Sequence, residues 1–389
     1  MALALEGSQA MARAVALCRP QVVAAYPITP QTHIVEGIAK LVADGRLDCE
    51  MVSVESEHSA ATVALGAALA GSRAYTASSS QGILLMSEVI FNIAGLRVPL
   101  VMTCANRALG APLSIWNDQQ DSMAVRDAGW IQIYCATNQE AVDTTIQAFR
   151  IAERCELPVM VCVDGFTLTH TLEGLEMPTQ EQVDTYLPAY RYARALDPAA
   201  PISVGMLVTP EHFSEVRHAH HQAVLRALPE IEAADADYAA LTGRAAGGLL
   251  EVRGDASARI GILAIGSVLG TLEDAMLSQP DLPRTRLIKL RSFRPFPAEA
   301  LRRACEGLDH LIILERAISP GAGAILGPEV VMALVDGGTL PKVHDVAAGL
   351  GGRDMRIDLY RRLLALTESD PKPFHVIDAR LEQLPEEDR

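Results

Sequence analysis

The stretches VVAAYPITPQT, residues 22–32, and VSVESEHSAA, residues 52–61, decide the fold of this chain. The first is an apolar run that ends in the turn-forming sequence YPITP, which predicts a strand over residues 22–28 followed by a loop. The second predicts a strand over residues 51–55 that delivers Glu57 at the start of a helix rich in small residues. In a parallel α/β sheet the carboxyl ends of the strands meet at one edge, where such sheets bind ligands. The two stretches therefore predict one binding site at one sheet edge.

The strand–loop–helix pattern repeats through the first part of the chain. Further strands are predicted over residues 74–78, 100–105, 131–135 and 159–164, and helices over residues 33–42, 59–70 and 139–153. Short apolar runs that alternate with helices predict a doubly wound parallel sheet. The composition, 49% apolar but only 4% aromatic, is typical of helices packed on such a sheet.

The length of 389 residues predicts two domains. After residue 171 the regular pattern gives way to a proline-containing connection, a polar helix over 210–228 and an acidic, alanine-rich stretch. A second α/β unit follows, with strands predicted over residues 260–265, 286–290 and 310–314 and helices over 269–277 and 298–305. We therefore predict a first domain over 1–171, a connecting segment over 172–247 and a second domain over 248–389.

Charge and cysteine usage exclude several classes of function. The net charge of −15 disfavours nucleic acid or an anionic membrane as partner. No run approaches the roughly 18 apolar residues of a membrane span, and the N-terminus reads as a first helix rather than a signal peptide, so a cytoplasmic location is expected. The seven cysteines include no CxxC pair, so we expect neither a zinc site nor an iron–sulfur cluster on this chain, and most should be buried and reduced.

Four stretches together resemble a known family. They are the two quoted above, LVMTCANR ending at Arg107, and the loop APLSIWNDQQDSM over residues 111–123. The chain resembles the alpha subunit of the 2-oxoacid:ferredoxin oxidoreductases, the thiamin diphosphate enzymes that include pyruvate synthase. The resemblance spans almost the whole chain and implies a doubly wound pyrimidine-binding domain followed by a transketolase C-terminal-like α/β domain. RSFRPFP and ERAISPGAGA, residues 291–297 and 315–324, match that second domain and should shape loops and an interface.

The resemblance implies that Glu57 is the carboxylate at the pyrimidine N1′ of the cofactor, with Tyr26 and Pro27 beside it. A carboxyl in an apolar pocket holds a proton more readily, which suits proton sharing with N1′. The alternative is an acid placed in the first turn of a helix, where the helix dipole favours it. Strand alternation should point the neighbouring Glu55 to the opposite face.

The resemblance also implies that Thr29 and Arg107 contact the 2-oxoacid. The guanidinium fork of an arginine suits a carboxylate, and each charge-assisted hydrogen bond is worth roughly 1.5–3 kcal/mol. The alternatives are a simple turn at Thr29 and an edge salt bridge at Arg107. Asn117 and Asp118 belong to the matched substrate loop, and Gly110 would leave room for a larger substrate.

The partners and the reaction are also implied by the resemblance. The GDG motif that holds the cofactor Mg²⁺ is absent, so a beta subunit would bind the diphosphate and its metal. Gamma and ferredoxin-like delta subunits would carry iron–sulfur clusters, and a flavin or NAD subunit is a further option. The implied reaction is coenzyme A-dependent oxidative decarboxylation, with pyruvate favoured narrowly over phenylglyoxylate and with ferredoxin or NAD as final acceptor. The alternative is a non-catalytic scaffold or regulatory subunit.

Two weaker patterns favour structural interpretations. The glycines of GILAIGSVLG lack the GxGxxG spacing and predict a tight turn between a strand and a helix. Three histidines on the polar helix predict a solvated face rather than a metal site; they are His218, His220 and His221.

Overall fold

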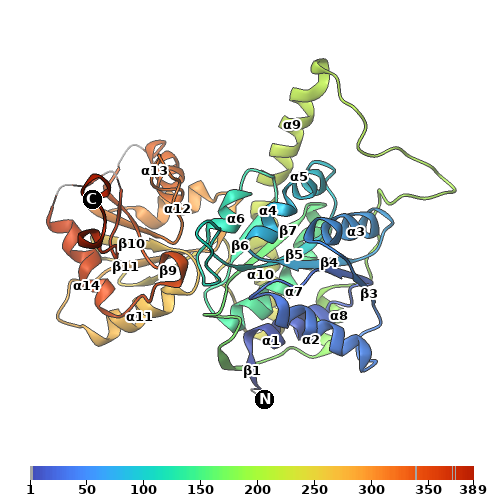
Figure 1. The fold of residues 1–389 in the computed structure, drawn as a ribbon, viewed down its shortest axis with the longest axis horizontal. Coiled ribbons are helices and arrows are strands. Elements are labelled where there is room, and N and C mark those ends of the chain that lie inside the picture. Colours follow the sequence, from blue (N-terminus) through green and yellow to red (C-terminus); the bar gives the residue numbers. More distant parts are fainter. Residues whose placement is uncertain (1–2, 338–339, 370, 373) are drawn as a thin grey trace.

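The computed structural model describes residues 3–337, 340–369, 371–372 and 374–389, which form two α/β units built on two large sheets (Figure 1). The first sheet has seven strands in the order β12-β6-β7-β5-β4-β2-β3. All neighbours are parallel except β12 and β6. Its strands are β2 Val22–Ala25, β3 Glu50–Ser53, β4 Ala74–Ser78, β5 Val101–Asn106, β6 Ile131–Tyr134, β7 Val159–Asp164 and β12 Ser292–Arg294.

Helices cover both faces of this sheet. One face carries α1 Gly7–Leu17, α2 Thr32–Ala43, α7 Asn138–Cys155 and α10 Ala227–Thr242, whose apolar residues share one core with the strands. The other face carries α3 Glu57–Leu69, α4 Gln81–Leu85, α5 Ser87–Gly95 and α6 Gln120–Ala124. The buried side of α3 is built from alanines, so the helix lies close on β2 and β4.

The second sheet has six strands in the order β15-β14-β13-β10-β11-β9, parallel except for β9 against β11. They are β9 Leu250–Gly254, β10 Ile260–Ala264, β11 Arg286–Leu290, β13 His310–Glu315, β14 Lys342–Ala347 and β15 His375–Val376. Its helices are α11 Val268–Ser278, α12 Ala298–Cys305, α13 Leu326–Val335 and α14 Asp358–Ala365. Short 3₁₀ turns lie at Leu350–Gly352, Leu366–Glu368, Leu381–Gln383 and Glu386–Asp388. The face under α12 and α13 joins the core of the first unit.

The segment between the two units is more ordered than the sequence suggested. Strand β8, Leu172–Leu175, pairs with β1, Leu3–Glu6, and α8 spans Gln180–Tyr186. Every residue from 196 to 219 is exposed, and this part of the chain runs out from the body and returns along α9, Pro210–Leu225 (Figure 1).

The predicted fold class is confirmed, and all the predicted strands are present. Strand β2 ends at Ala25, three residues before the predicted end, because the chain turns at YPITP. The first helix predicted near the N-terminus is present as α1, and the short strand β1 precedes it. The acidic, alanine-rich stretch, for which no element was predicted, is α10, which packs on α7. RSFRPFP contains β12 rather than only a loop. The boundaries at residues 171 and 247 stay predictions.

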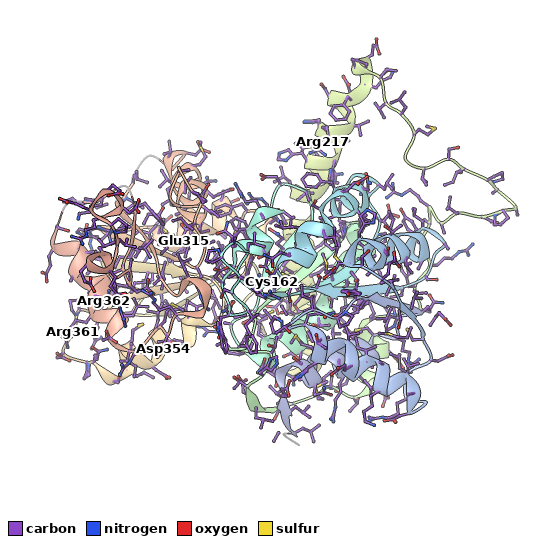
Figure 2. The ribbon with its side chains drawn as sticks, viewed as in Figure 1. Cys162, Arg217, Glu315, Asp354, Arg361 and Arg362 are labelled. Atoms are coloured by element: carbon purple, nitrogen blue, oxygen red, sulfur yellow. The ribbon has the colours of Figure 1, made fainter. Side chains whose placement is uncertain are left out.

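Two predictions about polar side chains have different outcomes. Five of the seven cysteines are buried and all seven are free thiols, as expected; Cys162 lies in the first unit (Figure 2). The prediction of a solvated histidine face fails for His220, which is buried against Gly129, while His218 and His221 are exposed.

No helix among the described residues is long and apolar enough to cross a bilayer.

Candidate functional site

Glu57 is the first residue of α3 and lies near the carboxyl end of β4. Ser56 caps the helix, because its hydroxyl accepts the Ser59 N–H at 3.2 Å. The Glu57 side chain is only 7% exposed, yet its carboxylate hydrogen-bonds no residue that the structure describes. The dipole of α3 alone favours a charge there, and the carboxylate oxygens are not closed off from solvent, so a ligand can reach them.

Gly82, at the start of α4, forms the wall against which Glu57 packs. A Cβ atom at Gly82 would lie 2.8 Å from Glu57 Oε1 and 2.3 Å from Ser78 Oγ, so only glycine fits. The Ser78 hydroxyl is buried and also has no partner among the described residues. Sequence reasoning missed Gly82 and Ser78, and the run SSSQG at a strand end was the available signal.

Arg107 follows β5 and meets Thr29, so two predicted residues from distant parts of the chain come together. Arg107 Nη1 donates to the Thr29 carbonyl oxygen at 2.9 Å, and Nε donates to the Ser114 carbonyl oxygen at 3.1 Å. Burial lowers the pKa of the Arg107 guanidinium, and the nearby Asp121 carboxylate opposes this shift. No described carboxylate forms the edge salt bridge that was the alternative for Arg107. The Thr29 side chain is exposed.

Asn117 and Asp118 are adjacent in one loop, but their side chains have different surroundings. Asn117 is 2% exposed and neither atom of its amide has a hydrogen-bond partner among the described residues. The Asp118 carboxylate, in contrast, accepts the N–H groups of Gln120 at 3.0 Å and of Gly351 at 3.1 Å. Gly351 belongs to the second unit, so Asp118 joins the two units. Burial raises the pKa of the Asp118 carboxyl.

Four further residues considered in the sequence lie around this edge. The room expected beside Gly110 is filled, since a Cβ there would lie 2.8 Å from the amide nitrogen of Gln81. Tyr26 and Pro27 lie exposed just beyond the end of β2. Glu55 is exposed and accepts a hydrogen bond from Ser59, so it is separated from the buried surroundings of Glu57, as predicted. The reason is different, because β3 ends at Ser53 and the turn before α3, not strand alternation, separates the two residues.

A buried ion pair holds the second unit against this edge. Asp164, the last residue of β7, is 1% exposed and pairs with Arg316 Nη1 at 2.9 Å. The same carboxylate accepts the Ser267 N–H at 2.8 Å and the Gln119 amide at 3.1 Å. Arg316 and Ser267 lie in two of the motifs singled out in the sequence, ERAISPGAGA and GILAIGSVLG. The interface role predicted for the first of them agrees with this contact.

The fold defines a structural class: a doubly wound α/β domain followed by a second α/β domain, an arrangement that two solved structures share. The chain superposes on 2-oxoglutarate:ferredoxin oxidoreductase from Magnetococcus marinus with a TM-score of 0.69 and 18% identity, covering 93% of this chain and 64% of that one. It also superposes on a split-gene transketolase, an inactive beta4 tetramer, with a TM-score of 0.54, 15% identity and coverage of 94% and 97%.

The sequence narrows the class to a family. Residues 13–235 match the family described as pyruvate flavodoxin/ferredoxin oxidoreductase, thiamine diphosphate-binding, and residues 258–359 match pyruvate:ferredoxin oxidoreductase core domain II. Pyruvate synthase subunit PorA of Methanosarcina barkeri is 40% identical over 98% of this chain and 96% of its own length. Ketoisovalerate oxidoreductase subunit VorA of Pyrococcus horikoshii is 39% identical over 91% and 90%. The chain belongs to the alpha subunits of the 2-oxoacid:ferredoxin oxidoreductase family.

Proposed function

We propose that this chain forms half of the active site of a thiamin diphosphate-dependent 2-oxoacid oxidoreductase, with Glu57 on the cofactor pyrimidine and Arg107 on the substrate carboxylate. The observation that carries the proposal is the buried Glu57 carboxylate without a hydrogen-bond partner among the described residues. A carboxylate that makes no hydrogen bond to its own chain and remains accessible at the floor of the site is free to bind a ligand. The protonated pyrimidine nitrogen N1′ has the chemistry to do so.

When bound, thiamin diphosphate supplies the nucleophilic carbon and the electron sink for decarboxylation. Glu57 would hold the proton at N1′, and Gly82, which has no side chain, leaves room for that carboxylate beside α4. The Ser78 hydroxyl lies beside Glu57 and offers a second polar contact for the same ring. Tyr26 and Pro27, exposed at the end of β2, are proposed to flank the ring.

Arg107 would orient the 2-oxoacid by its carboxylate. Its Nε and Nη1 atoms are engaged by backbone carbonyl oxygens, which fixes the plane of the guanidinium and leaves the Nη2 donors for a ligand. The Thr29 hydroxyl, on the residue that accepts from Arg107, would donate to the substrate. The amide of Asn117, buried without a described partner, is the third candidate contact.

The reaction converts a 2-oxoacid and coenzyme A into an acyl-CoA, carbon dioxide, one proton and two electrons. Nothing in the described part of the chain groups three or more metal-ligating side chains around a cysteine. We therefore assign the iron–sulfur clusters to gamma and delta partner chains, and the diphosphate with its Mg²⁺ to a beta subunit. A final acceptor of ferredoxin type fits the family, and NAD through a flavin subunit is the other option.

Pyruvate is the proposed substrate. The Gln81 amide beside Gly110 leaves less room than the sequence suggested, which favours a small acyl group over an aryl one such as phenylglyoxylate. Relatives with 40% identity or more carry the name pyruvate synthase. A scaffold role is not favoured by any observation, because a scaffold has no use for an unpartnered buried carboxylate.

The test is viologen reduction by the complex purified with its native partners. We expect activity that requires coenzyme A and that is higher with pyruvate than with phenylglyoxylate. A complex that contains thiamin diphosphate and iron–sulfur clusters, yet oxidises no 2-oxoacid, would contradict the proposal. Higher activity with phenylglyoxylate would contradict only the assignment of the substrate.

A further inference from the structure

Asp121 is a fully buried carboxylate next to the proposed site that the mechanism above does not use. Its Oδ2 atom accepts the N–H groups of Ser80 at 2.8 Å and of Arg107 at 3.0 Å. Its Oδ1 atom accepts from Asn106 Nδ2 and from the Ser122 N–H, both at 2.8 Å. No described cation lies within ion-pair distance of Asp121. The Cys104 thiol also contacts Oδ2, at 3.6 Å, and the Arg107 guanidinium attracts the carboxylate at longer range.

The two backbone groups on Oδ2 belong to the two turns that carry the site. Arg107 N begins the loop after β5 from which the guanidinium reaches Thr29. Ser80 N lies two residues before Gly82, the wall of Glu57. A single oxygen atom therefore links the turn beside Glu57 to the turn of Arg107.

The backbone conformation of Ser80 depends on this link. Its backbone has φ +50° and ψ −128°, a conformation that residues with a side chain rarely adopt. Such a conformation persists only where the surroundings hold it. Asp121 holds the Ser80 N–H, and the Ala108 carbonyl oxygen accepts from the Ser80 hydroxyl at 2.5 Å. If the Asp121 acceptor is lost, Ser80 can relax, and Gly82 moves with it.

We propose that Asp121 is a positioning residue that fixes the separation between the pyrimidine-holding and the carboxylate-holding halves of the site. The inference rests on the proposed function. Its consequence is specific: one substitution at Asp121 disturbs the binding of two different ligands, because it releases two turns. A residue that acts on Arg107 alone would disturb only the 2-oxoacid.

The chain offers a matched control at Asp235 in α10. Asp235 is 4% exposed and, like Asp121, accepts three backbone N–H groups and one side-chain amide. Its donors are Ala246, Gly247, Gly248 and Gln147, none of which belongs to the proposed site. Asp121→Asn and Asp235→Asn therefore remove equivalent acceptors, one at the site and one away from it.

The experiment compares both variants with the wild type in the assembled complex. Asp121→Asn should raise both the pyruvate KM and the thiamin diphosphate concentration for half-activation by about tenfold or more, since small displacements of positioned groups have large effects. Both variants should lower the melting temperature of the complex to a similar degree. Asp235→Asn should leave the pyruvate KM and the thiamin diphosphate concentration for half-activation within about twofold of the wild type. Equal constants in the two variants would overturn the inference.

A second variant tests the inference even if Asp121→Asn does not fold or assemble. If Asp121→Asn does not assemble, Asn106→Ala removes only one donor from Asp121, and it should shift the same two constants by a smaller factor. A shift in neither constant would also overturn the inference. Failure of the proposed function is a separate result, because the wild-type complex itself would then show no activity with any 2-oxoacid.

Discussion

Two buried glutamates, Glu57 and Glu315, lie at equivalent places in the two halves of the molecule and have opposite surroundings. Each lies at the carboxyl end of its sheet beside the start of a helix; Glu315 is in the second unit (Figure 2). The Glu315 carboxylate accepts the N–H groups of Ile325, Leu326 and Gly327 at 2.7–3.2 Å, so it caps α13. The Glu57 carboxylate has no hydrogen bond to any described residue.

The comparison distinguishes a glutamate that stabilises the fold from one that is available for a ligand. Glu315 satisfies the free N–H groups of a helix start, which is a structural use of a buried charge. In α3 the equivalent task is performed by Ser56, whose hydroxyl caps the helix and leaves the Glu57 carboxylate free. Where a fold supplies a cap and still buries an acid, the acid is available for a ligand.

The largest expected effect is on turnover in Glu57→Gln. The variant cannot hold a proton as a carboxylate does, and general acid–base groups contribute about 10²- to 10⁴-fold to rates. Since Glu57 makes no hydrogen bond within the described chain, the melting temperature of the complex should hardly change. Viologen reduction with pyruvate and calorimetry measure both, and Glu55→Gln, on the exposed neighbour, is the control. Wild-type-like turnover in Glu57→Gln would remove Glu57 from the mechanism.

The second effect is on substrate affinity in Arg107→Lys. A lysine keeps the charge but cannot donate to Thr29, Ser114 and a carboxylate in one plane. Loss of one charge-assisted hydrogen bond, about 1.5–3 kcal/mol, should raise the pyruvate KM by about 10- to 150-fold. The half-activation concentration of thiamin diphosphate should stay close to the wild-type value. A normal pyruvate KM would show that the substrate carboxylate binds elsewhere.

The sequence predicted Glu57, Thr29 and Arg107, because each follows a clear strand in a family-like motif. It could not predict that Arg107 donates to the Thr29 carbonyl oxygen, since that contact depends on how β2 and β5 are placed in the sheet. Gly82 was missed because its importance comes from the side chain of Glu57, not from its own neighbours in sequence. The small strand β12 was missed because three residues give no periodicity to read.

The third effect, Glu315→Gln, is on stability and tests the other side of the comparison. A glutamine places an N–H₂ group where one acceptor oxygen was, so at least one N–H of α13 loses its partner at an estimated cost of about 1–3 kcal/mol. Thermal unfolding of the complex should occur at a lower temperature. The rate per active site with pyruvate should remain near the wild-type value, because Glu315 lies in the second unit. A large loss of rate without loss of stability would break the distinction between the two glutamates.

The smallest effect is a pH dependence of the free energy of unfolding, which arises from the buried Asp345 carboxyl beside Glu315. Burial, and then the charge of Glu315, raise the pKa of the Asp345 carboxyl from 3.8 to about 9. The folded protein therefore keeps a proton on Asp345 that the unfolded chain releases above pH 4. This contribution to stability is fully present below about pH 4 and is lost as the pH rises through about 9, by up to about 1.4 kcal/mol per pH unit.

Asp345→Asn tests this pH dependence, because the amide imitates the protonated acid at every pH. Between pH 6 and 9 the melting temperature of the wild type should fall more steeply than that of the variant. Parallel curves would show that Asp345 is ionised beside Glu315, in which case the capping of α13 would have to tolerate a second buried charge. No change in this slope is expected in Glu57→Gln, because Glu57 lies in the other unit.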